Sequence, residues 1–215
     1  MQHGSVFDRA RKRRGTSADL LVVGIGNPGA QFVGTRHNIG VDVLEVLARR
    51  HAKAGTSGAL TPARKERSLI AEIEFDGARV VLAFPQTYMN LSGEALALLV
   101  PRYGIEEPRQ VVVVQDELDL PVGALKIKLG GGHAGHNGLR SIDEHLGSRD
   151  YVRVRVGVGR PPGERQGKDH VLRRPGREER EELDIVVAEA ADAIECYQSS
   201  GLDETMNRYN RSNRS

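Results

Sequence analysis

The chain has 215 residues, of which 39% are hydrophobic and 28% are charged, and its formal net charge is only +2. This length suits one domain with a substantial core. No run of 18 apolar residues is present, so we expect no membrane-spanning helix. The single cysteine, Cys196, excludes a disulfide framework and a cysteine-based metal site, and a reducing, cytoplasmic setting fits best.

The positive charge is concentrated near the N-terminus, where residues 9–14 read RARKRR. Such a segment attracts polyanions such as RNA, although a solvated, disordered tail has the same composition. We therefore expect residues 1–19 to form a basic, disordered extension. Residues 20–210 should form the folded domain, and residues 211–215 a short tail.

The first half of the folded region alternates strand and helix signals. The apolar run LLVVG at 20–24 predicts a buried strand. Residues 40–54 carry apolar side chains at helical spacing, and the polar stretch 54–67 is typical of a loop. The runs SLIAEIEF and ARVVLAF are strand-like, and Asp76-Gly77 between them predicts a hairpin turn.

A second helix and two strands follow. Ser92 is the expected N-cap of a helix through ALALLV, which Pro101 should end or kink. The apolar run QVVVVQ predicts a central strand of a sheet. The segment ALKIKL alternates with period two, so Lys126 and Lys128 should share the face opposite to its apolar side chains.

The last part of the chain repeats this alternation. A glycine-rich loop at 130–138 leads into a short helix, and YVRVRVGV predicts a strand with Arg153 and Arg155 on one face. A Pro/Gly loop at 159–168 precedes a long helix from about Arg177. Its buried stripe should comprise Leu183, Val187, Ala190, Ile194 and Tyr197. The pattern indicates a single α/β domain: a three-layer αβα sandwich with a mixed, mostly parallel sheet.

The stretch GIGNPG after the first strand has the letters of a dinucleotide-binding loop, G-x-G-x-x-G. That fingerprint requires a helix to begin inside the glycine segment and a carboxylate to close the next strand. Here the helix begins only after Asn38, and the next element is a helix instead of a strand. We interpret the glycines as a tight turn that presents Asn27 at the sheet edge.

Four loops carry polar groups at expected strand ends or helix starts. They contain Asn27 with His37-Asn38, Asn90 in QTYMNLSG, Asp116 in QDELDLP, and His133, His136 and Asn137 in GGGHAGHNG. Sites of α/β proteins gather where strands end and loops begin.

One histidine, one aspartate and several asparagines suit a hydrolytic reaction. A neutral histidine accepts a proton from water near pH 7, an aspartate on its other nitrogen fixes the tautomer, and amides bind an oxyanion. Because no serine or cysteine is placed as a nucleophile, activated water acting on an ester is the natural hypothesis. The two histidines of HAGH suggest a metal, but no third ligand has the usual spacing, so we expect none.

Five segments together resemble the bacterial peptidyl-tRNA hydrolase family from about Leu21 to Asn210. They are GNPGAQFVGTRHNIG, QTYMNLSG, DELDLP, GGGHAGHNGLRSI and RVRVGVGRP, in this order. The resemblance implies a cytoplasmic monomer without metal or organic cofactor. It further implies hydrolysis of the ester that joins an N-blocked peptide to tRNA, which recycles tRNA from stalled translation.

The resemblance also implies roles for individual residues. His37 matches the catalytic base, Asp116 its support, and Asn27 the group that helps to distinguish N-blocked substrates from free aminoacyl-tRNA. The matching substrate-binding residues are Phe32, Tyr88, Asn90 and Asn137, and the matching tRNA contacts are Lys126, Lys128 and Arg155.

Some positions depart from the common pattern of the family. Phe32 replaces a frequent tyrosine, Tyr88 a frequent phenylalanine, Ala134 a frequent glycine, and Gln115 a frequent histidine or aromatic residue. These changes affect fine geometry and substrate preference without removing a catalytic group. A non-enzymatic RNA-binding relative and a nucleotide-dependent oxidoreductase remain the two alternatives.

Overall fold

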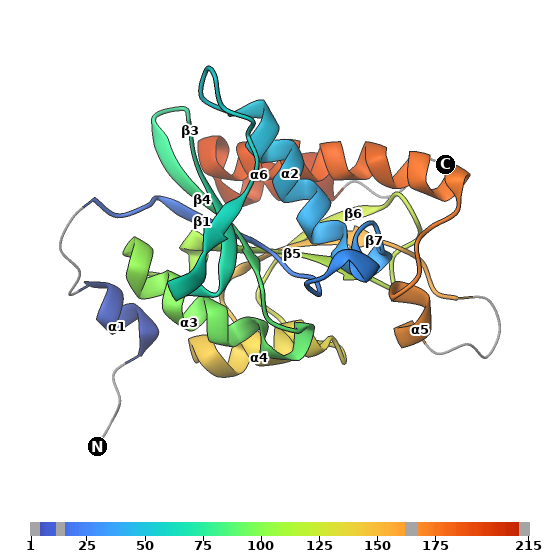
Figure 1. Cartoon of the computed structure of the whole chain (residues 1–215), viewed down its shortest axis with the longest axis horizontal. Helices are drawn as coiled ribbons and strands as arrows, with labels where there is room; N and C mark the ends of the chain where they lie inside the picture. Colours follow the sequence, from blue (N-terminus) through green and yellow to red (C-terminus); the bar gives the residue numbers. More distant parts are fainter. Residues whose placement is uncertain (1–4, 12–15, 162–166, 211–215) are drawn as a thin grey trace.

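A computed structural model describes residues 5–11, 16–161 and 167–210 of the chain (Figure 1). In this part of the chain, a seven-stranded sheet has the strand order β2-β3-β4-β1-β5-β7-β6. Its strands are β1 (Leu20–Gly24), β2 (Thr61–Ala63), β3 (Ser68–Phe75), β4 (Ala78–Pro85), β5 (Val111–Glu117), β6 (Leu125–Leu129) and β7 (Val152–Gly157).

The sheet is mixed, as predicted, but among the described strands the parallel pairings do not outnumber the antiparallel ones, so it is not mostly parallel. Strand β1 lies in the middle and pairs in parallel with β4 and β5, and β5 pairs in parallel with β7. Strands β3 and β6 pair with their neighbours in antiparallel fashion. The β3–β4 hairpin turns at Asp76 and Gly77, which both have positive φ, as a tight two-residue turn requires.

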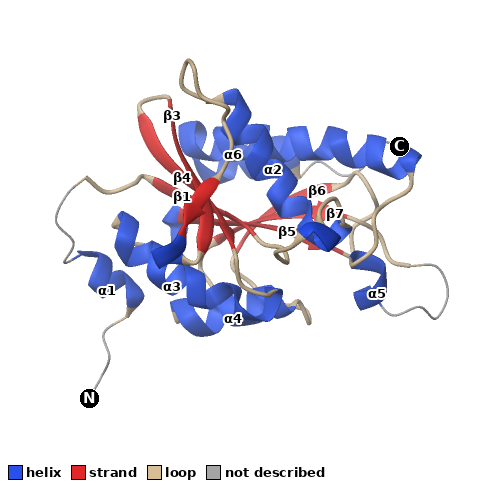
Figure 2. Cartoon of the chain, in the orientation of Figure 1, coloured by secondary structure: helices blue, strands red, loops and turns tan. Residues whose placement is uncertain are grey.

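Helices cover both faces of the sheet, so the predicted three-layer αβα arrangement is confirmed (Figure 2). One face carries α2 (Ile39–Arg50) and α6 (Arg177–Tyr209), and the predicted stripe of α6 packs there. The other face carries α1 (Val6–Arg11), α3 (Ser92–Tyr103) and α4 (Asn137–Leu146). The short α5 (Gly167–Val171) precedes α6.

Successive side chains of the central strands point to opposite faces of the sheet, and this explains the two hydrophobic cores. Val112 and Val114 of β5 face α2 and α6, whereas Val111 and Val113 face α3 and α4. Strands that are buried on both faces consist of continuous apolar runs, which is why LLVVG and VVVV show no alternation of apolar and polar residues.

Several local predictions differ from the structure. Residues 6–11, within the segment expected to be disordered, form α1 and bury Val6, Phe7 and Ala10. Strand β2 lies inside the expected loop 54–67. Ser92 is the first residue of α3 and not its N-cap, since its hydroxyl donates to the Met89 carbonyl, and the helix continues through Pro101. In the described part of the chain, no helix is long and apolar enough to cross a membrane.

Candidate active site

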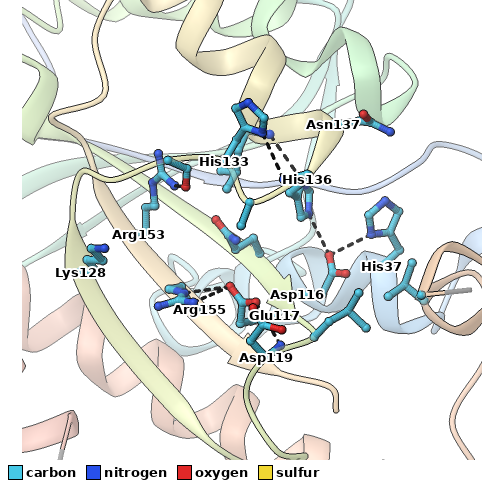
Figure 3. A pocket seen from close by; sticks show the side chains of 18 of the residues that line it. His37, Asp116, Glu117, Asp119, Lys128, His133, His136, Asn137, Arg153 and Arg155 are labelled. Carbon is cyan, nitrogen blue, oxygen red and sulfur yellow. Dashed lines mark hydrogen bonds and ion pairs between the residues drawn. The ribbon is translucent and has the colours of Figure 1, made fainter. Parts of the chain in front are cut away.

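The turn that carries His37 meets the end of β5 near the carboxyl ends of β1 and β5. His37 lies in η2 (Arg36–Asn38), a 3-10 turn that leads into α2, and Asp116 lies near the end of β5. The His37 Nδ1–H donates to Asp116 Oδ1 over 2.9 Å (Figure 3). Asp116 is only 4% exposed, so the predicted base and its predicted support form a contact that is largely shielded from water.

His136 is a second histidine on the same carboxylate. Its Nδ1 accepts from the backbone N–H groups of Gly138 and Leu139 at the start of α4. The other ring nitrogen, Nε2, must therefore carry a proton, and it donates to Asp116 Oδ1 over 3.2 Å. Metal binding was the only specific role that the sequence raised for His136, and the spacing of the possible ligands argued against it. Its position directly before a helix, where it acts as N-cap, was the signal for this tautomer.

The shared carboxylate controls the charge of the site. Burial raises the pKa of Asp116, but the charge of His37 and the hydrogen bonds from both histidines lower it far more, so the carboxylate stays ionised. Burial lowers the pKa of His37, whereas the charge of Asp116 and its hydrogen bond raise it, and the net pKa lies above 6.5. With Nδ1–H bound to Asp116, Nε2 is the nitrogen left to accept a proton.

The ligand atoms of His37, Asp116 and His136 lie within 4.8 Å of one another, close enough to consider a metal ion. The hydrogen bonds argue against this use of the cluster. Both histidine nitrogens that face Asp116 are N–H donors, and metal ligation requires a deprotonated nitrogen. To bind a metal through Nε2, His136 would have to give up its role as the N-cap of α4.

Asn27 is held in place by a reciprocal pair of hydrogen bonds with Asn38. The Asn27 N–H donates to Asn38 Oδ1, and Asn38 Nδ2 donates to the Asn27 carbonyl, both over 2.9 Å. The Asn27 Oδ1 accepts from the Met89 N–H over 2.8 Å, which leaves Nδ2 as the group that can donate to a ligand. Sequence reasoning noted Asn38 beside His37 without giving it this role.

The glycines of GIGNPG serve this packing. A Cβ on Gly24 would overlap the carbonyl of Gly40 in α2, and a Cβ on Gly26 would lie 2.8 Å from Asn38 Oδ1. Residues 25–29 lead into η1 (Ala30–Phe32) and η2, and α2 begins only at Ile39. The segment therefore lacks the helix start that a pyrophosphate site needs.

A pocket of about 440 Å³, called here the histidine pocket, opens beside His37. It is lined by the end of β5, the glycine-rich loop 130–137, β7 and α5. Asn137, the first residue of α4, and Gln115 also line it, and the buried Oε1 of Gln115 accepts no hydrogen bond from a described residue.

The remaining predicted substrate residues lie around Asn27. Asn90 is exposed in η4 (Met89–Leu91), beside the backbone that Asn27 binds, and Tyr88 before it is 61% exposed. Phe32 is half-buried at the end of η1. These three residues are absent from the lining of the histidine pocket.

The predicted tRNA contacts lie on neighbouring strands. In the β6–β7 register, Lys126 pairs with Arg155 and Lys128 with Arg153. Both lysines are exposed, and neither forms an ion pair with a described residue. Arg155 forms an ion pair with Glu117 over 2.8 Å (Figure 3), so part of its charge is already neutralised. Arg153 is buried and donates to the carbonyls of Gly131 and Gly132.

Arg36, next to His37, is a buried cation that the sequence did not single out. Its guanidinium binds both carboxylate oxygens of Glu179 in α6 and the carbonyls of His170 and Arg173. This fork ties the His37 turn to the connection between α5 and α6, on one side of the histidine pocket.

Comparisons with known proteins agree on one family. The family described as Peptidyl-tRNA hydrolase matches residues 21–215. The Peptidyl-tRNA hydrolase of Pseudarthrobacter chlorophenolicus is 48% identical over 191 residues, which cover 88% of this chain and 94% of that protein. The Peptidyl-tRNA hydrolase of Frankia alni is 46% identical over 189 residues, which cover 88% of this chain and 92% of that protein. The crystal structure of peptidyl-tRNA hydrolase from Acinetobacter baumannii superposes with a TM-score of 0.83 at 30% identity, covering 94% of this chain and all of that one.

Proposed function

The chain belongs to the peptidyl-tRNA hydrolase family, and we propose that His37 performs its ester hydrolysis by activating a water molecule. His37 Nε2 takes a proton from water, and the resulting hydroxide attacks the carbonyl carbon of the ester between peptide and ribose. Asp116 stabilises the imidazolium that forms. His37 then returns the proton to the ribose oxygen as the carbon–oxygen bond breaks, which yields a peptide carboxylic acid and free tRNA.

His136 supports the same step as a positioning residue. Its locked Nε2–H holds the carboxylate of Asp116, so that Oδ1 points at His37. Asn90 and Asn137 are the proposed donors to the oxyanion of the tetrahedral intermediate, since an amide binds a developing negative charge without adding charge of its own. Phe32 and Tyr88 provide apolar contacts to the substrate nearby.

Asn27 is proposed to distinguish a blocked substrate from an unblocked one. Its Oδ1 is occupied by the Met89 N–H, so the group it presents is the donor Nδ2. An N-blocked substrate carries an amide carbonyl that accepts this hydrogen bond, whereas a free aminoacyl ester carries an ammonium group, which only donates. The unmatched pair of donors disfavours aminoacyl-tRNA.

Lys126, Lys128 and Arg155 are proposed to bind the tRNA backbone. The exposure of both lysines supports this role, and such contacts position the nucleic acid without reading its sequence. Arg155 contributes less while it is paired with Glu117. The proposed enzyme is a cytoplasmic monomer that uses neither a metal nor an organic cofactor, with its hydrolase domain at residues 20–210.

The observation that carries this mechanism is the hydrogen-bonded series His37–Asp116–His136 beside an open pocket. It is tested by release of an N-acetyl-aminoacyl group from tRNA, compared with unblocked aminoacyl-tRNA. The wild type should cleave only the blocked substrate, His37→Ala should lose turnover while retaining tRNA binding, and the remote His51→Ala should resemble the wild type. Wild-type protein that binds tRNA but cleaves neither substrate would instead be a non-enzymatic RNA-binding relative.

A further inference from the structure

The C-terminal end of α6 lies at the outer edge of the sheet. Strand β6 is the last strand in the sheet order, and among the described strands it pairs only with β7. The backbone groups on its outer side therefore have no neighbouring strand to bind, and such groups are costly when they are buried without a partner. Asn210, the first residue after α6, lies against this edge.

The side chain of Asn210 binds both backbone groups of one residue of β6. Its Oδ1 accepts from the Ile127 N–H over 2.6 Å, and its Nδ2 donates to the Ile127 carbonyl over 2.8 Å. A carboxamide carries the same donor and acceptor as a peptide group, so Asn210 takes the place of one residue of a neighbouring strand. The backbone N–H of Asn210 donates to the Met206 carbonyl, which anchors the residue to the last turn of α6.

Ile127 lies between the two lysines that are the proposed tRNA contacts. Its side chain is 1% exposed and belongs to the core on the α6 face of the sheet. Because successive side chains of a strand alternate, Lys126 and Lys128 point away from α6, and both are exposed. Two residues apart on an extended strand, their Cα atoms are about 6.6 Å apart. This spacing and this direction depend on the backbone of Ile127 staying extended.

We infer that Asn210 is a positioning residue for tRNA binding: by holding the backbone of Ile127, it fixes Lys126 and Lys128 in the arrangement that meets the tRNA backbone. This inference rests on the proposed function, which gives the two lysines their role. Strand β6 has only 5 residues, and a short strand at the edge of a sheet opens more readily than a central one. Without Asn210, tRNA binding would have to order β6 as well, and the cost of that ordering would weaken the affinity.

The chemistry of the contact explains why its effect must pass through the lysines. Asn210 is uncharged, so it adds nothing to the long-range attraction between the protein and the phosphates. Its two polar side-chain atoms are both engaged by Ile127. The proposed catalytic contact of His37 with Asp116 involves η2 and β5 instead of β6, so the chemical step should not change.

A double-mutant cycle tests this coupling. Affinity for deacylated tRNA, and kcat and KM for N-acetyl-aminoacyl-tRNA, are measured for the wild type, Asn210→Ala, the variant with both Lys126→Gln and Lys128→Gln, and the combination of all these changes. We expect Asn210→Ala to weaken tRNA binding and raise KM about fivefold with kcat unchanged, and to add nothing once both lysines are replaced. Ser200→Ala, at an exposed, uncharged position of the same helix, should not alter binding in either background.

The outcomes separate this inference from the function on which it rests. If replacing both lysines leaves tRNA binding at the wild-type level, the proposed role of the lysines is wrong and the inference fails with it. If the lysine variant binds weakly but Asn210→Ala does not, or if Asn210→Ala weakens binding equally in both backgrounds or lowers kcat, only the assignment of Asn210 is overturned. A wild type that hydrolyses no N-acetyl-aminoacyl-tRNA overturns the proposed reaction, while the binding cycle still tests Asn210. Thermal unfolding checks that the variant folds; if it does not, Asn210→Ser, whose single hydroxyl cannot replace both polar atoms of the carboxamide, takes its place in the cycle.

Discussion

Replacing Asp116 by Asn tests the centre of the proposed mechanism with the smallest change of shape. The variant keeps an oxygen that can accept from His37 and His136, but it removes the negative charge that faces the imidazolium in the transition state. Because Asp116 is 4% exposed, water can replace little of the lost interaction. The effect should therefore fall on the chemical step, and tRNA binding should change little.

The magnitude follows from the separation of the two groups. For opposite unit charges at the His37–Asp116 distance of 2.9 Å, an effective dielectric constant of about 20 gives an attraction of about 6 kcal/mol. At about 1.4 kcal/mol per tenfold change in rate, this attraction corresponds to about four orders of magnitude as an upper limit. The amide dipole of the variant retains part of the attraction, so we expect kcat to fall by about 10³- to 10⁴-fold.

The pH dependence gives an independent signature. In the wild type the pKa of His37 is raised above its ordinary value of 6.5, and the base is inactive when protonated. The value of kcat/KM should therefore rise as the pH increases through this raised pKa. In Asp116→Asn the burial that lowers the pKa of His37 remains, while the charge that raises it is gone. The acidic limb of the profile should therefore move to lower pH although the plateau is far lower.

The assay is single-turnover release of N-acetyl-aminoacyl groups from tRNA across pH 5 to 9. Asp76→Asn, in the exposed hairpin turn between β3 and β4, is the matched control and should behave as the wild type. If Asp116→Asn retains kcat within tenfold of the wild type, or if its acidic limb moves to higher pH, then Asp116 does not act on His37 through its charge.

Three further changes test the surroundings of the site. Gly24→Ala should lower the free energy of unfolding in urea by about 1–3 kcal/mol, because its Cβ meets the carbonyl of Gly40. Lys128→Ala should weaken tRNA binding and lower the slope of log K against log salt by about 0.7–0.9, with no loss of kcat at saturation. Arg36→Gln should cost about 3 kcal/mol of stability, since it leaves the carboxylate of Glu179 without its partner, and adding Glu179→Gln should recover part of that loss in the same urea titration.

The fold was predictable where local pattern and tertiary packing agree. The continuous apolar runs of β1 and β5 report burial on both faces, and the stripe of α6 reports a single buried side. Asp76-Gly77 fixes its own turn, because both residues tolerate positive φ. Each of these signals comes from a few neighbouring residues.

The misses arise where a distant contact overrides the local pattern. The basic composition near the N-terminus predicts disorder, yet Val6 and Phe7 of α1 are buried against the face formed by α3 and α4. Ser92 looks like a cap, but the preceding 3-10 turn brings the Met89 carbonyl to its hydroxyl, and the hydroxyl donates there instead. Composition and capping preference carry no information about these partners.

The candidate site likewise contains residues that the sequence located and a contact that it did not show. His37, Asp116 and Asn137 were placed by their positions at strand ends and helix starts, and the structure brings them to one pocket. The contact between His136 and Asp116 joins positions 20 residues apart in the chain, and it depends on which ring nitrogen caps α4. Spacing along the chain does not show the contact with Asp116. Only the position of His136 directly before a helix indicates its tautomer, which the backbone N–H groups at the helix start determine.

Ala134 shows how strongly the fold constrains this loop. The backbone of Ala134 has a φ of +45°, in the left-handed region, where a residue with a Cβ is destabilised by about 1–2 kcal/mol. This cost explains why we expect glycine at this position in many members of the family. Contacts on both sides impose the conformation: Arg153 holds the carbonyls of Gly131 and Gly132, and the His136 N–H donates to the His133 carbonyl over 2.7 Å. The same turn aims His136 Nε2 at Asp116, so the strain at Ala134 is held in place by the contacts that orient this positioning residue.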